Sequence, residues 1–476
     1  MFYRVNLKKY KNESCLTMYD IIIIGAGTAG IAAYKEAIKY TQNILIINKG
    51  SWDTTCARVG CMPSKVLIAA ANRTHDIQTA EKLGLSVIPE IDTSQVMQHV
   101  RMLRDRFTRA TLKDVNSWPK EHKILGQAQF INSNTVAVNR QEYQAKSFIV
   151  AVGSTPTFDL EWKKQLGDRL ITSDQIFELE RLPQSLAVIG SGVIAIELAQ
   201  AMQRLGVKTT VFARSRKVGA LSSPTLQKLA QDEISKNLNI KFETLPTKVQ
   251  LGTQGVMINF QENDQPQQLN AEYILVATGR KSYLDTLQLV NIDNTFTDLK
   301  KLPIDNQTKQ LGNYPIFIAG DAHTNTPIQH ETAHEGRGAV HNCLNYPKIE
   351  NLKTLTPLSI VFSSPEMATV GKSFKQLLDA KIDFVIGTVS YEKQGRALIL
   401  GRNSGAVEVY VDKTSRKLLG AELLVESAEH MAHLLAWMIS EELTIDDILN
   451  KPFYHPTLEE GLRTSLKYAR RQLNEI

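Results

Sequence analysis

Short runs of consecutive apolar residues recur along the chain and predict buried strands. Several of them end in glycine, which a tight turn after a strand favours. The runs cover, in chain order, Ile21–Ile24, Ile44–Ile47, Ser147–Gly153, Leu186–Ile189, Thr209–Phe212, Tyr273–Gly279 and Ile316–Ala319. Continuous apolar runs of this length are typical of parallel strands that are buried on both faces. The pattern therefore predicts an α/β protein.

The first strand leads into a glycine-rich turn. Gly25, Gly27 and Gly30 follow Ile21–Ile24, and an alanine-rich helical stretch comes next. The three glycines permit a tight turn, the approach of the backbone to a pyrophosphate, and close packing of the helix on the strand. The N-terminus of the helix then faces the phosphates. This unit predicts a dinucleotide site.

The same arrangement recurs further along the chain. Leu186–Ile189 is followed by Gly190, Gly192 and Ala195, and then by a helix that we expect to end near Arg204. A single glycine motif is weak evidence, whereas two complete units of strand, turn and helix rarely arise by chance. The chain is therefore expected to bind two nucleotides.

The C-terminal part of the chain has a different pattern. Asp321 follows the strand Ile316–Ala319 and Gly320, so we expect its carboxylate at the C-terminal edge of a sheet, where open α/β sheets bind ligands. From about Leu352, alternating strands and two helical stretches predict a separate α+β domain.

Composition excludes several classes of protein. The chain has 476 residues, enough for several domains, and its net charge of +6 comes from scattered lysines and arginines, so we expect no nucleic-acid partner. The four cysteines are too few for a secreted disulfide scaffold, and no apolar stretch is long enough to span a bilayer. We therefore expect a cytoplasmic protein without a membrane partner, and no motif predicts a metal site.

The leader, residues 1–17, is basic and polar and lacks the apolar centre of a secretory signal. We expect it to be disordered or to reflect a misplaced start site, because Met18 directly precedes the first strand. An organelle transit peptide is the alternative.

Cys56 and Cys61 lie just beyond the second strand, in Thr-Thr-Cys-Ala-Arg-Val-Gly-Cys-Met-Pro-Ser-Lys. On an ideal helix, residues five apart have Cα atoms about 8 to 9 Å apart, whereas a disulfide needs roughly 4.4 to 6.8 Å. The segment must therefore be locally unwound if the two bond. Gly60 supplies backbone freedom for this, and Pro63 fits a first helical turn. Two ordinary buried thiols are the alternative.

Taken together, the motifs resemble the flavin-dependent pyridine nucleotide-disulfide oxidoreductases, the family of dihydrolipoyl dehydrogenase, glutathione reductase and mercuric reductase. The resemblance covers nearly all of Tyr19–Leu466 and is closest to dihydrolipoyl dehydrogenase-like proteins. The motifs, in the family's order, are the first glycine turn, the Cys56/Cys61 pair, the second glycine turn, the Ala-Thr-Gly strand, Gly320-Asp321, Ser364-Pro365-Glu366 and His455-Pro456-Thr457-Leu458-Glu459-Glu460.

The resemblance implies two Rossmann-like domains and a C-terminal α+β dimerisation domain. FAD would bind residues 18–153 and 283–351, NAD(P)H would bind residues 154–282, and residues 352–476 would form the homodimer, with each active site shared between subunits. Gly153, Gly279 and Asp321 would contact the cofactors, with Asp321 on the ribityl chain of FAD. The first unit lacks the usual acid at the end of its second strand, so we expect Asn48 there to bind ribose more weakly.

The resemblance also implies the catalytic roles. Cys56 would meet the substrate disulfide and Cys61 would exchange electrons with the flavin, while Lys65 would pair with Glu197 near the reactive flavin nitrogen. Disulfide exchange needs a thiolate, and a neutral imidazole can accept and return that proton near neutral pH. His455, which Pro456 keeps on a turn, would be this base in the partner's site, with Glu460 as its carboxylate.

The strand Thr209–Phe212 ends in Ala213-Arg214-Ser215-Arg216-Lys217, without an acid at the ribose position. Arginine can grip a phosphate bidentately and a carboxylate would repel it, so Arg214 and Arg216 favour NADPH over NADH. Ala195 in place of a third glycine also resembles NADPH-using members. A solvated basic turn is the alternative.

We therefore predict an FAD enzyme that moves two electrons between dihydrolipoyl groups and NAD(P), most like dihydrolipoyl dehydrogenase. A lipoyl-bearing 2-oxo acid dehydrogenase complex is its candidate partner. The alternatives are an NADPH-dependent reductase of a small disulfide, similar to glutathione reductase, and a redox-inactive flavoprotein that serves as a binding or scaffold subunit. Neither the true disulfide nor the physiological direction follows from the sequence.

Overall fold

The computed structural model of the chain describes residues 18–253, 255–323 and 328–475, so the expectations for the leader lie outside the described residues. The described chain divides into two compact units, each made of three segments. Unit 1 runs through Thr54 and adds Thr111–Ser154 and Ser282–Lys353. Unit 2 contains Thr55–Ala110, Thr155–Lys281 and the chain from Thr354 onward. The nucleotide-domain boundaries expected from the sequence stay a prediction.

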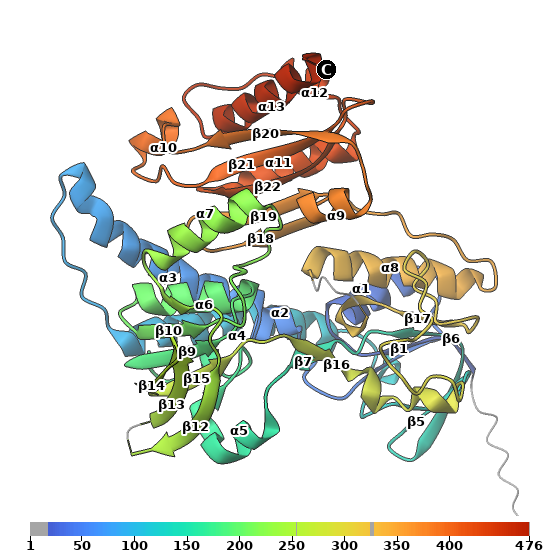
Figure 1. The fold of residues 1–476 in the computed structure, drawn as a ribbon. Coiled ribbons are helices and arrows are strands. Elements are labelled where there is room, and N and C mark those ends of the chain that lie inside the picture. The colour runs from blue at the N-terminus through green and yellow to red at the C-terminus, as the bar shows by residue number, and fades with distance from the viewer. Residues whose placement is uncertain (1–17, 254, 324–327, 476) are drawn as a thin grey trace, which may run out of the picture. The chain divides into compact units, whose positions relative to one another are not determined.

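Unit 1 is built on a sheet in which β1 is central (Figure 1). The strand order is β3-β2-β1-β6-β5-β4, with β17 also paired to β6, and β1 is parallel to both β2 and β6. Its elements are β1 (Met18–Ile24), α1 (Thr28–Ala37), β2 (Ile44–Asn48), β3 (Lys123–Leu125), β4 (Gln129–Asn132), β5 (Thr135–Val138), β6 (Gln141–Val150), β17 (Ile316–Ile318) and α8 (Gln329–Asn345).

The central strand of unit 1 is buried on both faces. Ile21, Ile22 and Ile23 are each 0% exposed, and alternate residues point into two separate apolar clusters. One cluster also contains residues of α1 and α8, which pack against each other. Because both faces need apolar side chains, the strand reads as a continuous apolar run.

The first half of unit 2 contains a second parallel sheet, in the order β11-β10-β9-β15-β8. An antiparallel sheet β12-β13-β14 extends the region, and β7 pairs with β16. The elements are α2 (Thr55–Arg58), α3 (Cys61–Thr79), α4 (Thr93–Asn116, which continues beyond unit 2), β7 (Ser154–Pro156), α5 (Leu160–Leu166), β8 (Leu170–Ile171), β9 (Ser185–Ile189), α6 (Val193–Arg204), β10 (Lys208–Phe212), α7 (Pro224–Ser235), β11 (Asn239–Lys241), β12 (Pro246–Gly252), β13 (Gly255–Glu262), β14 (Gln265–Ala271), β15 (Tyr273–Val276) and β16 (Arg280–Ser282).

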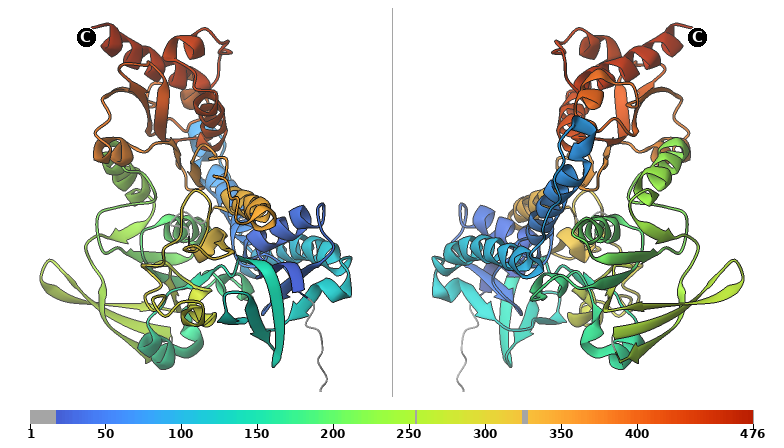
Figure 2. Two further views of the ribbon diagram at one scale, coloured as in Figure 1. Left: turned by 90° about the vertical axis from the view of Figure 1, so that its right-hand side faces the viewer. Right: turned by 90° about the vertical axis from the view of Figure 1, so that its left-hand side faces the viewer.

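The C-terminal part of unit 2 is an antiparallel sheet in the order β18-β19-β22-β21-β20. The helices α11 and α13, drawn in red, pack against this sheet (Figure 2). The elements are β18 (Leu358–Val361), β19 (Glu366–Gly371), α9 (Phe374–Asp379), β20 (Phe384–Ser390), α10 (Gly395–Ile399), β21 (Ala406–Asp412), β22 (Leu418–Val425), α11 (Ala428–Ser440), α12 (Ile445–Leu449) and α13 (Glu459–Asn474).

The mixed α/β fold agrees with the sequence, but three details differ. The strands expected to continue to Gly153 and Gly279 end at Val150 and Val276. The C-terminal part has the short helices α9, α10 and α12 in addition to the two helical stretches that were expected. These short helices begin at side-chain caps, and they are too short to show a helical period in the sequence.

Candidate functional site

The first glycine turn leaves no room for side chains at two of its three glycines. Gly25 has φ +107°, and a Cβ on Gly30 would lie 1.8 Å from the carbonyl oxygen of Gly25. A Cβ on Gly27 would meet no atom within 4 Å. Gly27 precedes α1, and no side chain caps that helix. This arrangement fits a pyrophosphate, which binds at such helix N-termini.

Asn48, at the end of β2, is already engaged with nearby backbone. Its Oδ1 accepts from the N–H of Ala26 at 3.1 Å, and its Nδ2 donates to the carbonyl oxygens of Gly50 and Ser51 at 3.0 and 2.8 Å. The side chain therefore ties the glycine turn to the segment after β2. Ribose binding by Asn48 stays a prediction.

Asp321 lies just beyond β17, as the sequence predicts. Its carboxylate accepts from the hydroxyls of Ser154 and Thr332 at 3.3 and 3.5 Å. Gly153, at φ +71°, turns the chain directly before Ser154. Residues from two segments of unit 1, Thr111–Ser154 and Ser282–Lys353, thus meet around this carboxylate.

The second glycine turn repeats the geometry of the first. Gly190 has φ +119°, and a Cβ there would lie 2.6 Å from the carbonyl oxygen of Ala277. A Cβ on Gly192, which precedes α6, would meet nothing within 4 Å, and no side chain caps the helix. Ala195 is fully buried. The turn therefore fits a second nucleotide.

Arg214 and Arg216 follow β10 and are both exposed. Arg216 lies 3.8 Å from Glu243 and stacks over the ring of Phe242, with its guanidinium carbon 5.2 Å from the ring centroid. The arginines follow β10, which pairs with β9. The second glycine turn follows β9. Gly279, expected at this site, has φ +126° in the turn after β15. A role for these residues toward a 2′-phosphate stays a prediction.

The cysteine segment is unwound where the sequence requires it. The helix α2 ends at Arg58 and α3 begins at Cys61, and between them Gly60 has φ −120° and ψ −121°, outside the helical region. Pro63 lies in the first turn of α3. Both thiols are free in the structure, and they are hydrogen-bonded to each other.

This thiol pair is electrostatically asymmetric. The hydrogen bond from Cys56 and the charge of Lys65 lower the pKa of Cys61 to about 6. The same hydrogen bond, together with burial, raises the pKa of Cys56. Cys61 is therefore the thiolate of the reduced pair, and Cys56 donates to it.

Lys65 lies one helical turn after Cys61 and forms an ion pair with Glu197 on α6, with Nζ 2.8 Å from Oε2. The other carboxylate oxygen of Glu197 accepts from the N–H of Phe362 at 2.9 Å. The ring of Phe362 covers Lys65, with its centroid 4.6 Å from Nζ. Glu197 is 4% exposed, so its buried negative charge must be stabilised by the ammonium of Lys65 and the N–H of Phe362.

His455 and Glu460 also meet. The Nδ1 of His455 lies 3.1 and 3.0 Å from the two carboxylate oxygens of Glu460, and His455 is exposed on a bend before α13. The hydrogen bond from His455, followed by that from the N–H of Thr457, lowers the pKa of Glu460. The ring can therefore present its Nε2 outward while Glu460 holds Nδ1.

The sequence did not predict that the backbone of residues 362–364 is hydrogen-bonded to α6. Gln200 is three residues after Glu197 on α6, and it exchanges two hydrogen bonds with the backbone of Ser364, of 2.7 and 3.0 Å. Together, Glu197 and Gln200 bind the C-terminal end of β18 to α6. The spacing of a Glu and a Gln on one helical face was the only signal, and such pairs are common on solvated helices.

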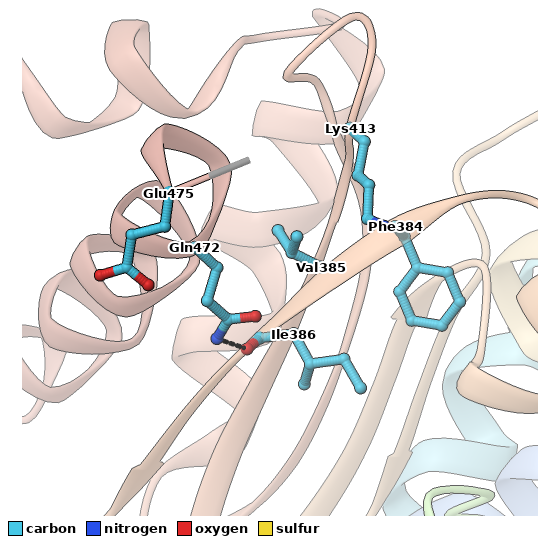
Figure 3. A pocket seen from close by; sticks show the side chains of 6 residues that line it. All are labelled: Phe384, Val385, Ile386, Lys413, Gln472 and Glu475. Atoms are coloured by element: carbon cyan, nitrogen blue, oxygen red, sulfur yellow. Dashed lines mark hydrogen bonds between the residues drawn. The ribbon is translucent and has the colours of Figure 1, made fainter.

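A hollow in the C-terminal part of unit 2 is unrelated to these residues. It has a volume of about 460 Å³ and lies beside β20 and α13 (Figure 3). There Gln472 donates to the carbonyl oxygen of Ile386 at 2.7 Å, and none of the predicted site residues lines the hollow. Among the described residues, no three His, Cys, Asp or Glu side chains are grouped as metal ligands, and no helix is long and apolar enough to cross a membrane.

The comparisons with known proteins agree with this geometry. Residues 19–336 match the pyridine nucleotide-disulphide oxidoreductase family, and residues 358–466 match the dimerisation domain of the same family. Mercuric reductase from Staphylococcus aureus is 28% identical, covering 94% of this chain and 81% of the relative. Dihydrolipoyl dehydrogenase from Geobacillus stearothermophilus is also 28% identical, covering 93% and 94%.

Two solved structures share the fold. LpdA from Mycobacterium tuberculosis gives a TM-score of 0.80 at 20% identity, over 96% of this chain and 100% of the other. The HOCl-induced flavoprotein disulfide reductase RclA from Escherichia coli, as a Cu(II) complex, gives a TM-score of 0.78 at 19% identity, over 95% and 99%.

The motifs, the fold and the two family matches lead to one assignment. The fold class expected from the sequence is confirmed, with its C-terminal dimerisation domain, which supports a homodimer. The family implies FAD and a pyridine nucleotide, and the two open glycine turns fit both. The chain belongs to the pyridine nucleotide-disulphide oxidoreductase family.

Proposed function

We propose that the protein is an FAD-dependent dithiol/disulfide oxidoreductase, most like dihydrolipoyl dehydrogenase. The observation that carries this proposal is the thiol pair, in which Cys56 and Cys61 meet across a break between two helices and have opposite pKa shifts. The charge of Lys65 beside the pair favours a thiolate, which a redox pair needs and two ordinary core thiols do not. This argues against the redox-inactive scaffold.

In the oxidative direction, a thiolate of the dihydrolipoyl group attacks the sulfur of Cys56 in the Cys56–Cys61 disulfide. The bond between the cysteines breaks, a mixed disulfide forms, and the electron pair stays on Cys61 as thiolate. The second substrate thiol, after losing its proton to His455, attacks its own mixed-disulfide sulfur and releases the oxidised ring. Cys56 leaves as a thiolate and takes up a proton. Bound FAD supplies the two-electron transfer between the dithiol and NAD(P).

Lys65 and Glu197 support the electron-accepting cysteine. The charge of Lys65 lowers the pKa of Cys61, so the thiolate persists near neutral pH. Glu197 fixes the position of that ammonium group through the 2.8 Å ion pair. We infer that this pair also borders the reactive edge of the flavin.

The assembly that we propose is a homodimer in which His455 and Glu460 act in the partner's site. His455 is exposed in the single subunit, which suits a residue that meets another chain. A complex with a lipoyl-bearing 2-oxo acid dehydrogenase and a cytoplasmic location belong to the same proposal. The relatives named dihydrolipoyl dehydrogenase support it.

NADPH is the proposed nicotinamide, and this choice favours one alternative function. Arg214 and Arg216 are exposed beyond β10, with no acid in Ala213–Lys217 to repel a phosphate. A preference for NADPH suits a reductase of a small disulfide, similar to glutathione reductase, working in the reverse direction. Arg214 and Arg216, together with Ala195, favour this second candidate.

The experiment is an assay of purified holoenzyme with lipoamide and with glutathione disulfide, each against NADH and NADPH. Turnover of lipoamide above that of glutathione disulfide supports the dihydrolipoyl dehydrogenase-like activity. Turnover of glutathione disulfide alone makes the second candidate correct. No turnover of either disulfide, in protein that retains FAD, contradicts both.

A further inference from the structure

The turn between His455 and Glu460 decides whether their side chains can meet. Thr457 links the two, because its N–H donates to Oε2 of Glu460 at 3.2 Å and its hydroxyl donates to the carbonyl oxygen of Tyr454 at 2.9 Å. These bonds are local and lie on an exposed segment, so they restrain the turn only weakly. A stronger restraint must come from outside the turn.

Tyr391, directly after β20, supplies one such restraint. The residue is 0% exposed, and its hydroxyl donates to the carbonyl oxygen of Leu458 at 2.8 Å. The sulfur of Met431 lies 3.3 Å from the same hydroxyl. A Cβ on Gly461 would lie 2.5 Å from the Tyr391 hydroxyl, so the first turn of α13 rests directly on the phenol.

Gln394 supplies a second restraint. Its Nε2 donates to the carbonyl oxygen of Thr457 at 2.7 Å, while its Oε1 accepts from the N–H of Ala397 at 2.7 Å and caps α10. One amide therefore ties the turn to the start of a helix. Gln394 and Tyr391 hold two consecutive carbonyl groups of the turn, those of Thr457 and Leu458.

We propose that Tyr391 and Gln394 are positioning residues for the His455–Glu460 pair, which they hold in place through the backbone of Thr457 and Leu458. The inference rests on the proposed role of His455 as the base in disulfide exchange. The bonds of Tyr391 and Gln394 go to the backbone of the turn and not to His455 itself. Their action is to fix the turn, so that the imidazole keeps its carboxylate partner when the substrate thiol arrives.

Tyr391→Phe and Gln394→Glu test this with little change in shape. Tyr391→Phe removes the hydroxyl but keeps the buried ring, and Gln394→Glu keeps the oxygen that caps α10 but replaces the donor to Thr457 by an oxygen. Each should slow disulfide exchange about tenfold, the loss expected from one hydrogen bond in a positioning network. The rate to measure is reoxidation of the reduced enzyme by lipoamide or glutathione disulfide, whichever the wild type turns over.

Flavin reduction by the nicotinamide is the internal control, because it does not use His455. Tyr410→Phe is the matched control variant, since Tyr410 is also 0% exposed in this sheet but its hydroxyl bonds to Glu408 at 3.2 Å. Flavin reduction in Tyr391→Phe and Gln394→Glu should keep its wild-type rate. Tyr410→Phe should keep the wild-type rates of flavin reduction and of disulfide exchange. A general loss of folding would slow every step, whereas a loss of positioning slows the exchange step alone.

The pH profile gives a second readout. The charged groups that act on Glu460 are His455 and Arg463, and the bonds from His455 and Thr457 lower the pKa of this carboxyl. When the turn loosens, these bonds weaken and the pKa rises. The carboxyl carbon of Glu460, followed by NMR as the pH is varied, measures this pKa directly, and its midpoint should lie at a higher pH in Tyr391→Phe than in the wild type.

Wild-type exchange rates and an unchanged pKa of Glu460 in both variants would overturn the inference. His455→Ala separates this from failure of the proposed function. If His455→Ala slows exchange and the two positioning variants do not, only the inference is wrong. If disulfide exchange in His455→Ala proceeds at the wild-type rate, both the proposed role of His455 and the inference that rests on it are wrong.

Discussion

Lys65 and Glu197 form an ion pair of 2.8 Å although 132 positions separate them in the chain. Glu197 is almost fully buried and also accepts the N–H of Phe362, so neither oxygen is left without a partner. A buried carboxylate requires such compensation. The pair places a fixed positive charge one helical turn from Cys61, and the first prediction follows from this charge.

Replacing Lys65 by Met should raise the pKa of Cys61 from its value of about 6. The thiolate of Cys61 predominates above this pKa and is lost as the pH falls through it, so alkylation of the reduced protein by iodoacetamide should decline at a higher pH in the variant. Lys228→Met removes an exposed lysine that pairs with Asp232, and it should leave the profile unchanged. Identical profiles for the wild type and Lys65→Met would show that Lys65 does not act on Cys61.

Two glycines of the first turn should respond differently to alanine. In Gly30→Ala the new Cβ would lie 1.8 Å from a backbone oxygen, so the apoprotein itself should lose stability. In Gly27→Ala nothing stands within 4 Å, so the apoprotein should melt as the wild type does while FAD binds more weakly. Thermal melting of the apoproteins and FAD titration measure the two effects. Equal melting of both variants would contradict the close packing at Gly30.

Glu422 should be a large contributor to stability without any part in the reaction. It is 0% exposed and accepts from the N–H groups of Ser222, Ser223 and Phe374 at 2.7, 2.9 and 3.0 Å. Glu422→Ala leaves these donors unpaired and should destabilise unit 2 by about 3 kcal/mol.

Urea unfolding measures this loss, with Glu441→Ala as the control. Glu441 is exposed, so its replacement should change the free energy of unfolding by less than about 0.5 kcal/mol. Equal effects of the two substitutions would show that the buried carboxylate does not organise these backbone groups.

Replacing both Arg214 and Arg216 by Leu should raise the KM for NADPH by about a hundredfold or more, since each charge-assisted hydrogen bond to a phosphate contributes about 1.5 to 3 kcal/mol and two are lost. The KM for NADH should stay the same, because NADH has no 2′-phosphate. Steady-state kinetics with the two nucleotides, with Lys236→Met as a surface control, measure the change. A wild-type enzyme that prefers NADH would contradict the assignment of both arginines.

The sequence was sufficient for features that depend on local pattern. The two glycine turns, the break before Cys61 and the bend at His455 follow from the glycines and prolines themselves, because these residues restrict the backbone wherever they occur. Buried parallel strands were equally visible, since a run such as Ile21–Ile24 has no polar face. The strand ends were less visible, because the apolar runs continue to Gly153 and Gly279, three residues beyond the last strand residues Val150 and Val276.

Contacts between distant segments could not be predicted from the residues alone. The Lys65–Glu197 pair was expected only through the family resemblance, and nothing in the sequence indicated that Phe362 covers Lys65. Glu422 reads as an ordinary polar residue on a strand, and its backbone and hydroxyl donors come from two other segments. Tyr391 and Gln394 likewise act on a turn more than sixty positions away. Such contacts depend on tertiary packing, which has no local period.

The most direct test of the redox pair is an anaerobic titration of the FAD-loaded enzyme with the nicotinamide it prefers. If Cys56 and Cys61 form a redox-active disulfide, the wild type should take up one electron pair for the flavin and a second pair for the disulfide. Cys56→Ser should take up only the first pair, keep rapid flavin reduction and lose disulfide turnover. A wild-type protein that accepts only the flavin's electron pair, with the same endpoint as Cys56→Ser, would contradict the account.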